Sequence, residues 1–313
     1  MKSVTTAIST RDERRKVTNC HGGSQHKGAG ALRVKFYGVR GSTPCSCESN
    51  QRIGGNTACV VVTGDGFDPI VLDLGTGLRF WGTDVCAAGG SRPFRATALV
   101  SHLHWDHVQG LPFFPPLHRA ESSMHIIGPP QEDRTLEEAF HQFLCPPYFP
   151  VTLEQLAGTT TFEEATGDPI ELGPAIVTSR DVPHVGPTLG FRIDVGGASL
   201  AYVSDHQQPG CQSTVVADSV LELCDGVDLL IHDAQYTAPE FAERFDWGHC
   251  TTEYAIEVAA QAGVKQLALY HHDPSHDDDT VDSLCEHAAA MSALRRGPSV
   301  IAAAEGLELD LSC

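Results

Sequence analysis

A dense group of polar residues at the end of an apolar stretch constrains the fold of this chain more than any other feature. The segment Ser-His-Leu-His-Trp-Asp-His, residues 101–107, follows apolar residues that are typical of a buried strand. In an extended backbone alternate side chains point the same way, so His102 and His104 can reach one metal ion. If the chain then turns into a helix, Asp106 and His107 reach a second position nearby, as two-metal hydrolytic sites require. The alternative, four potential ligands in six positions on an ordinary solvated loop, is disfavoured.

Short apolar stretches alternate with helical patterns along the rest of the chain, with no low-complexity linker and no repeat of fixed period. This alternation predicts an α/β fold, and one large domain over residues 33–313 is the default expectation. Strands are expected at 33–39, 57–63, 69–73, 96–100, 123–127, 174–180, 188–194, 198–203, 228–232 and 266–270. Helices are expected near 77–87, 132–144, 214–224, 251–263 and 278–294.

The beginning of the chain differs from the rest in composition. Residues 1–32 are polar and charged and lack the apolar stretch of a secretory signal, so a disordered N-terminal tail is expected. A basic arm that contacts nucleic acid, or a transit-like segment, is the alternative. Residues 1–40 hold nine of the 21 Lys and Arg but two of the 40 Asp and Glu, so residues 41–313 carry a formal charge near −26. Such an acidic body disfavours binding along an extended nucleic acid.

The apolar runs and the cysteines indicate the cellular compartment in which the protein is expected. No run of about 18 apolar residues occurs, so no membrane-spanning helix and no membrane partner are expected. The 11 cysteines are odd in number and lack the regular framework of a disulfide-stapled domain, which favours a reducing cytoplasm. Cys45 and Cys47 form one close pair that could join a metal site, but no second pair lies at zinc-finger spacing.

The segment 102–107 resembles the His-x-His-x-Asp-His signature of the metallo-β-lactamase superfamily, which also follows a strand. The resemblance covers residues 33–310 and implies a four-layer αβ/βα sandwich with a centre of two metal ions. It also implies later ligands in a set order: an isolated histidine at His184, a bridging aspartate at Asp205 and a last histidine at His271. His271 is preferred over His272 because it directly follows an expected strand, and a slip of one residue would exchange them.

The implied ligand set divides between two ions. One ion is held by His102, His104 and His184, the other by Asp106, His107 and His271, and both by Asp205. Imidazoles combined with carboxylates favour zinc, with manganese and iron as alternatives. Two such ions lower the pKa of a shared water from ~15.7 toward ~7. Asp106 is therefore also a catalytic candidate, since its carboxylate can orient the nucleophile.

Three further stretches are similar to the branch of this superfamily that contains ribonuclease Z and related phosphodiesterases. They are Gly-Val-Arg-Gly-Ser-Thr-Pro at 38–44, Gly-Gly-Asn-Thr-Ala-Cys-Val at 54–60 and Trp-Gly-His-Cys-Thr-Thr at 247–252. In the last of these, His249 is the candidate donor to the phosphate and the candidate general acid, with a helix-capping role as the alternative. Asp233 could hold His249 in the required tautomer, and Asp73 could contact a metal-bound imidazole; turn capping is the alternative for both.

The spacing of the later ligands bears on the substrate. Ribonuclease Z enzymes that bind tRNA commonly carry a protruding arm, whereas 20 residues separate His184 from Asp205 and are expected to form two plain strands. Together with the acidic body, this favours a small phosphodiester such as a cyclic nucleotide or a cyclic phosphate. The alternatives are a thioesterase or glyoxalase-II-like hydrolase, a tRNA 3′-processing endonuclease, and a sensor or scaffold that binds metal without catalysis.

Two expectations concern the surroundings of the site. The stretch Pro146-Pro147-Tyr148-Phe149 is a candidate for a wall of the substrate cleft, where an aromatic ring could stack on a base, with ordinary packing as the alternative. Nothing in the sequence fixes the oligomeric state, and a homodimer is left open.

Deletion of residues 1–32 is expected to leave the melting temperature and the turnover of a small diester nearly unchanged, because these residues have the composition of a disordered tail. Thermal unfolding and steady-state kinetics of the truncated and full-length proteins provide the check. A loss of several degrees in melting temperature would show that the tail belongs to the fold.

Overall fold

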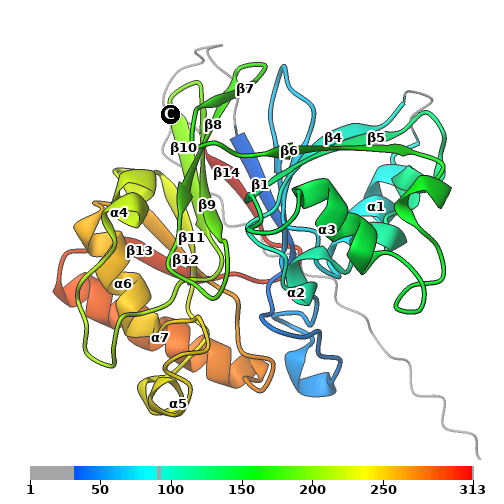
Figure 1. Ribbon diagram of the computed structural model, residues 1–313. Coiled ribbons are helices and arrows are strands. Elements are labelled where there is room, and N and C mark those ends of the chain that lie inside the picture. The colour runs from blue at the N-terminus through cyan, green and yellow to red at the C-terminus, as the bar shows by residue number, and fades with distance from the viewer. Residues whose placement is uncertain (1–31, 90–92, 312–313) are drawn as a thin grey trace, which may run out of the picture.

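The computed structural model describes residues 32–89 and 93–311. Within these ranges two seven-stranded sheets pack against one another, and helices cover the outer face of each sheet (Figure 1). One hydrophobic cluster lies between the sheets, and a further cluster lies between each sheet and its own helices. The expected four-layer αβ/βα sandwich is therefore confirmed.

The first sheet has the strand order β14-β1-β2-β3-β4-β5-β6 and the second has the order β13-β12-β11-β10-β9-β8-β7. The strands of the first sheet are β1 (Leu32–Gly38), β2 (Cys59–Thr63), β3 (Ile70–Leu72), β4 (Arg95–Leu99), β5 (Ser123–Gly128), β6 (Thr159–Glu164) and β14 (Glu308–Leu311). The strands of the second are β7 (Ile170–Leu172), β8 (Ala175–Asp181), β9 (Leu189–Val195), β10 (Ala198–Val203), β11 (Leu229–Asp233), β12 (Gln266–Tyr270) and β13 (Ser299–Ala302).

The helices divide between the two sheets (Figure 1). The first sheet is covered by α1 (Leu78–Ala87) and α3 (Leu136–Phe143), and the second by α4 (Asp218–Cys224), α6 (Thr252–Gln261) and α7 (Asp278–Leu294). Two short helices, α2 (Trp105–Val108) and α5 (Ala238–Glu243), lie in connecting segments beyond the strand ends. The sequence made a helix after His104 a condition for bringing Asp106 and His107 to a second position, and the structure contains such a helix as α2.

Strand β10 shows how the layers determine burial. All six of its residues are buried, because the strand lies inside the second sheet with apolar layers on both faces. Leu200 and Tyr202 join the cluster between the sheets, whereas Ala201 and Val203 join the cluster under the helices. This alternation is the period of two expected of a strand.

Parallel pairing brings several strand ends to one edge of the sandwich. Strands β3, β4 and β5 run parallel in the first sheet, and β10, β11 and β12 run parallel in the second. The carboxyl ends of parallel neighbours lie at the same edge of a sheet, and ligands of α/β proteins commonly bind outside that edge. The polar segments after β4, β10, β11 and β12 are therefore brought to a common region.

The expected elements agree with the structure within a few residues, and four strands were missed. The missed strands are β6, β7, β13 and β14, which are the edge strands of the two sheets. Among the helices, the one expected at 214–224 begins at Asp218, and the one expected at 132–144 begins at Leu136, where Thr135 and Glu138 form a capping box. The short helix α5 was also not expected.

Strand β1 begins one residue earlier than the sequence suggested. Leu32 is fully buried and pairs with Leu311, so a deletion of the expected tail should stop at residue 31. The remainder of that tail lies outside the described residues. Among the helices that the structure describes, none has the length and hydropathy needed to cross a membrane.

Candidate metal centre

Seven polar side chains converge at the edge of the sandwich where strands of both sheets end. They lie in the segment after β4, in α2, and in the loops after β8, β10 and β12: His102, His104, Asp106, His107, His184, Asp205 and His271. These are the seven residues nominated as ligands from the sequence. Because the segments start at strand ends, the backbone that carries the side chains is anchored in the two sheets.

The side chains form two adjoining groups of potential metal ligands. The nitrogens of His102, His104 and His184 form one group, and donor atoms of Asp106, His107 and His271 form another; within each group the atoms lie within 4.8 Å of one another. These two groups share no residue and match the division that the superfamily resemblance implies, while a third group, His102, His107 and Asp205, overlaps both. Three donors at such distances can reach a single cation.

Asp205 lies between the two groups. Its Oδ1 is 3.8 Å from Nε2 of both His102 and His184, and 3.5 Å from Nε2 of His271. Its Oδ2 lies 3.2 Å from Nε2 of His107. One carboxylate is thus within reach of imidazoles from both groups, which is the arrangement that a bridging ligand requires.

The orientation of the imidazoles is set by hydrogen bonds on their outer nitrogens. The Nδ1–H of His184 donates to the Gly248 carbonyl oxygen at 2.6 Å, and that of His271 donates to Gln235 Oε1 at 2.8 Å. The Nδ1–H of His102 donates to Ser101 Oγ at 3.0 Å. In each ring Nε2 is left as the acceptor nitrogen, with its lone pair directed at the cluster. His104 differs, because its Nδ1 faces His184 Nε2 at 3.3 Å.

Buried atoms without partners indicate that the cluster fits a cation. His102 Nε2 and Asp205 Oδ2 are buried and have no hydrogen-bond partner, although such groups are normally satisfied. Among the described residues, only histidines lie within ion-pair distance of Asp106 and Asp205. A divalent cation would satisfy the unpaired atoms and the buried carboxylates together, and the mixture of imidazole and carboxylate donors suits zinc.

The pKa values of the histidines also indicate that the cluster fits a cation. Burial lowers the pKa of His102 well below its ordinary value and lowers the pKa of His184 to about 4, so both rings are neutral and can donate a lone pair. Burial alone would lower the pKa of His107, but the carboxylates of Asp106, Asp205 and Asp73 raise it well above its ordinary value. The cluster therefore favours positive charge at Nε2 of His107.

The two adjacent histidines after β12 have different surroundings, and only one of them faces the cluster. Nε2 of His271 lies 3.1 Å from Asp106 Oδ2, inside the cluster. The Nε2–H of His272 donates instead to the Ala303 carbonyl oxygen at 2.9 Å, away from it. His271 has φ 57°, a conformation that side-chain-bearing residues rarely adopt. A Cβ at Gly41 would stand 2.4 Å from the His271 ring, so the ring fits only against a glycine.

Asp73 is a buried carboxylate that receives four hydrogen bonds beneath the cluster. The backbone N–H and Oγ of Ser101 donate to it at 2.7 and 2.8 Å, and the Tyr202 hydroxyl donates at 2.7 Å. The Nδ1–H of His107 donates to its Oδ2 at 2.7 Å. The contact expected between Asp73 and an imidazole is therefore present, and it fixes the tautomer of His107.

His249 lies against the cluster, and Asp233 orients it. Its Nδ1 is 3.0 Å from Asp233 Oδ2, and its ring stacks on His271 with centroids 5.0 Å apart. His249 also forms a group of potential metal ligands with Asp205 and His271. A carboxylate partner requires Nδ1 to carry a proton, which leaves Nε2 as the nitrogen that can gain or lose one. Burial alone would lower the pKa of His249, but the charge of Asp233 and the hydrogen bond to it raise that pKa above its ordinary value.

Several residues that support the cluster were not nominated from the sequence. Gln235, two residues after β11, accepts from His271, and the backbone N–H of Ser42 donates to Asp106 Oδ2 at 2.8 Å. Gln235 could have been suspected from its place at a strand end, but Ser42 acts through its backbone and leaves no signal of residue type. Cys45 and Cys47 belong to none of the groups of potential metal ligands found among the described residues.

Comparison with known proteins shows which family and which relatives this chain resembles in sequence. The family model described as β-lactamase superfamily domain matches residues 91–272. Ribonuclease Z of Synechococcus sp. (strain CC9311) is 23% identical over 320 residues, which cover 82% of this chain and 97% of the relative. An uncharacterized protein of Mycobacterium tuberculosis (strain ATCC 25618 / H37Rv) is 30% identical over 220 residues, which cover 66% of this chain and 70% of the relative.

A solved structure agrees over nearly the whole chain. The metallo-β-lactamase fold protein YhfI from Bacillus subtilis matches with a TM-score of 0.65 at 17% identity, covering 90% of this chain and 99% of that protein. At this identity the likeness concerns the fold.

Asp73→Asn is expected to weaken divalent metal binding about 10–100-fold, because an amide presents donors to groups that now donate to Asp73 and loosens the His107 ring. Competition with a chromogenic chelator measures the affinity. Asp228→Asn is the matched control, since Asp228 likewise accepts from the backbone N–H and hydroxyl of a serine, Ser199, but far from the cluster. Equal affinities in the two variants would remove Asp73 from the support of the centre.

Proposed function

Because the chain belongs to the metallo-β-lactamase superfamily and is a metal-dependent hydrolase, we propose that it cleaves a small phosphodiester at a centre of two divalent ions. A cyclic nucleotide or a cyclic phosphate is the proposed kind of substrate. The proposal rests on the ligand geometry, on a positioned histidine beside it and on the short connection between two of the ligands.

The proposed ligands follow the two groups of donors. One ion would be held by His102, His104 and His184 and the other by Asp106, His107 and His271, and Asp205 would contact both. When bound, two divalent ions supply a deprotonated water at neutral pH and neutralise charge on the phosphate. Their charge exceeds that of the two carboxylates, so the centre attracts a monoanion such as a diester. Zinc is the proposed metal, with manganese or iron as alternatives.

Asp106 is held in a fixed orientation that suits a role beyond metal binding. Its Oδ2 accepts from the backbone N–H of Ser42 at 2.8 Å and lies 3.1 Å from Nε2 of both His107 and His271. The carboxylate is buried, and its neighbours leave it one well-defined position. We propose that the Asp106 carboxylate orients the water that attacks the phosphate.

The observation that carries the phosphodiesterase proposal is His249, which sits beside the bridging Asp205 and is held by Asp233. With Nδ1–H committed to Asp233, Nε2 is the nitrogen free to hold a proton for a phosphate oxygen or a leaving alkoxide. Asp233 is fixed in turn by the backbone N–H groups of His206 and Gln235, each at 3.0 Å. Thioester hydrolysis has no need of such a donor, because a thiolate leaves without protonation.

The connection between His184 and Asp205 favours a small substrate. The residues between them form β9 and β10, joined directly by Gly196 and Gly197, both with positive φ. The expected pair of plain strands is therefore confirmed, and this segment carries no protruding arm. The formal net charge of −19 likewise disfavours a long polyanion.

A tRNA 3′-processing endonuclease is the second candidate, and the similarity to ribonuclease Z favours it. Assays of the metal-loaded protein with a cyclic nucleotide, bis(p-nitrophenyl) phosphate, a precursor tRNA and a thioester separate the candidates. Turnover of the small diesters without cleavage of the tRNA supports the proposal. Cleavage of the tRNA at much lower concentration than the small diesters, or preference for the thioester, contradicts it.

The metal-loaded protein should hold about two ions per chain, as a dinuclear hydrolytic centre requires. His271→Ala should lower the content to about one ion and abolish turnover. His272→Ala is the adjacent control, which should keep both ions because its ring faces Ala303. Elemental analysis after gel filtration gives the stoichiometry, and one ion or none in the parent protein would show that the centre is not dinuclear.

His249→Ala should retain both metals and the melting temperature but lower turnover of a cyclic nucleotide by about 10²–10⁴. The loss should be smaller for bis(p-nitrophenyl) phosphate, because p-nitrophenolate leaves with little need of a proton. His287→Ala, on the exposed face of α7, serves as the control with normal rates. Equal losses on both substrates would indicate charge stabilisation rather than proton donation, and no loss would reopen the thioesterase alternative.

A further inference from the structure

A pocket of about 720 Å³ lies beside the candidate metal centre, bounded by α2, α3 and the segment that ends at Phe149. This volume is in the range of pockets that bind small organic ligands. None of the seven proposed metal ligands lines this pocket, so the metal centre does not explain its presence.

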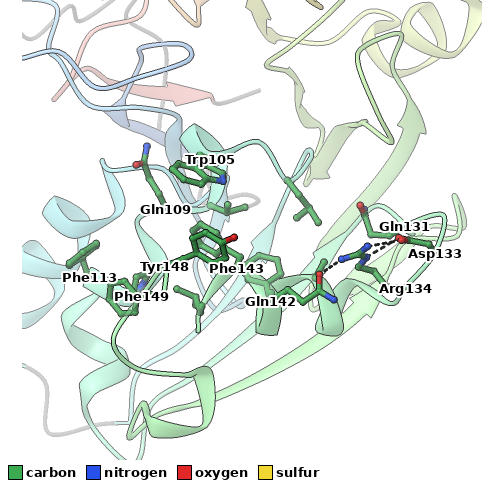
Figure 2. A pocket seen from close by; sticks show the side chains of 16 residues that line it. Trp105, Gln109, Phe113, Gln131, Asp133, Arg134, Gln142, Phe143, Tyr148 and Phe149 are labelled. Carbon is green, nitrogen blue, oxygen red and sulfur yellow. Dashed lines mark hydrogen bonds and ion pairs between the residues drawn. The ribbon is translucent and has the colours of Figure 1, made fainter. Parts of the chain in front are cut away.

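Aromatic rings gather in this pocket and remain open to solvent. Trp105, Phe113 and Tyr148 line it with 67%, 54% and 76% of their surfaces exposed. Phe143 stands with its ring centroid 6.5 Å from that of Trp105, and Phe149 meets Phe113 edge-on at 5.7 Å. Figure 2 shows Trp105, Phe143 and Tyr148 in the middle of the view, between Phe113 and Phe149 on the left and Arg134 on the right. A cluster of exposed rings is characteristic of a surface that stacks on a flat ligand.

The charged groups of the lining neutralise one another. Arg134 and Asp133 are the charged residues of the lining, and Arg134 donates to Asp133 at 2.8 and 2.6 Å and also to Gln142 Oε1. Figure 2 shows this network at the side of the pocket away from Phe113. A pocket with no net charge suits a neutral part of a ligand better than a second phosphate.

Side-chain amides supply hydrogen bonding around the rings. Gln109, Gln131 and Gln142 line the pocket. Gln131 uses its amide nitrogen on the Pro129 carbonyl, which leaves its oxygen as an acceptor, while Gln142 uses its oxygen on Arg134 and keeps its N–H donors. Flat rings together with amide donors and acceptors are the combination that recognises a nucleobase by stacking and by its polar edge.

The pocket begins at the rim of the metal centre. Trp105 follows His104 and precedes Asp106, so the stacking ring and two proposed metal ligands belong to consecutive residues about 3.8 Å apart along the backbone. His104 and Trp105 are both exposed, whereas Asp106 and His107 are buried. Leu103 and Trp105, which line the pocket, alternate in the chain with the proposed ligands His102 and His104, so the pocket and the metal centre flank the same short segment.

We propose that this pocket binds the nucleobase of the substrate, so that the enzyme acts on nucleotide diesters rather than on simple alkyl or cyclic phosphates. The inference rests on the proposed phosphodiesterase function and narrows its substrate class. Trp105 and Tyr148 supply the stacking surface, and the glutamines contact the edge of the base.

A matched pair of substrates tests this inference. Thymidine 5′-(p-nitrophenyl) phosphate and methyl p-nitrophenyl phosphate share the leaving group and differ in the nucleoside. The kcat/KM of the metal-loaded protein should be about tenfold or more higher for the thymidine ester, through a lower KM, as expected for stacking of one base. Tyr148→Ala and Trp105→Ala should shrink this ratio toward one, and Tyr148→Phe, which keeps the ring, should preserve it.

A binding measurement separates failure of this inference from failure of the proposed function. Calorimetric titration with thymidine 5′-phosphate and with methyl phosphate should show about tenfold tighter binding of the nucleotide, whether or not either ester is turned over. Phe80→Ala, which removes an exposed ring outside the pocket, is the control and should leave the preference intact. Turnover of both esters with equal kcat/KM, or equal binding of both phosphates, would overturn the nucleobase pocket. Absence of turnover with a retained binding preference would instead overturn the phosphodiesterase proposal.

Discussion

The buried carboxylate of Asp73 is the interaction on which the arrangement of the site depends. It follows β3 in the first sheet, yet the hydroxyl that donates to it from Tyr202 belongs to β10 in the second. The same carboxylate receives the N–H of Ser101, where the ligand segment begins, and the ring of His107. A buried charge is costly unless such donors surround it, so the approach of the sheets, the start of the ligand segment and one imidazole are fixed together.

The ligands of residues 102–107 could be predicted from a local rule, because they lie in a segment that begins at an apolar strand, whereas His184, Asp205 and His271 were implied by the superfamily resemblance. His102, Asp205 and His271 all lie within three residues of a strand end. The contacts that orient them could not be predicted, since they join segments far apart in the chain. Gln235 approaches His271 across 36 residues, and Ser42 meets Asp106 through a backbone N–H, which any residue type would provide.

The fold was predictable in its interior and not at its margins. Strands such as β10 are buried on both faces and read as continuous apolar stretches, so their positions were expected correctly. The four missed strands form the edges of the sheets, and β6, Thr-Thr-Thr-Phe-Glu-Glu, has no buried residue. An edge strand owes its conformation to its one neighbour rather than to its own hydrophobic pattern, and polar residues there also discourage pairing with other chains.

The ligands of the candidate centre come from both sheets: the segment after β4 belongs to the first, while His184, Asp205 and His271 belong to the second. A cation shared among them would act as a cross-link between segments as far as 169 residues apart in sequence, much as a disulfide closes a long loop. The packing of one sheet on the other would then depend in part on the bound cation. Loss of the cation would remove this link between the sheets, so the chain would unfold more readily and proteases would cleave it faster.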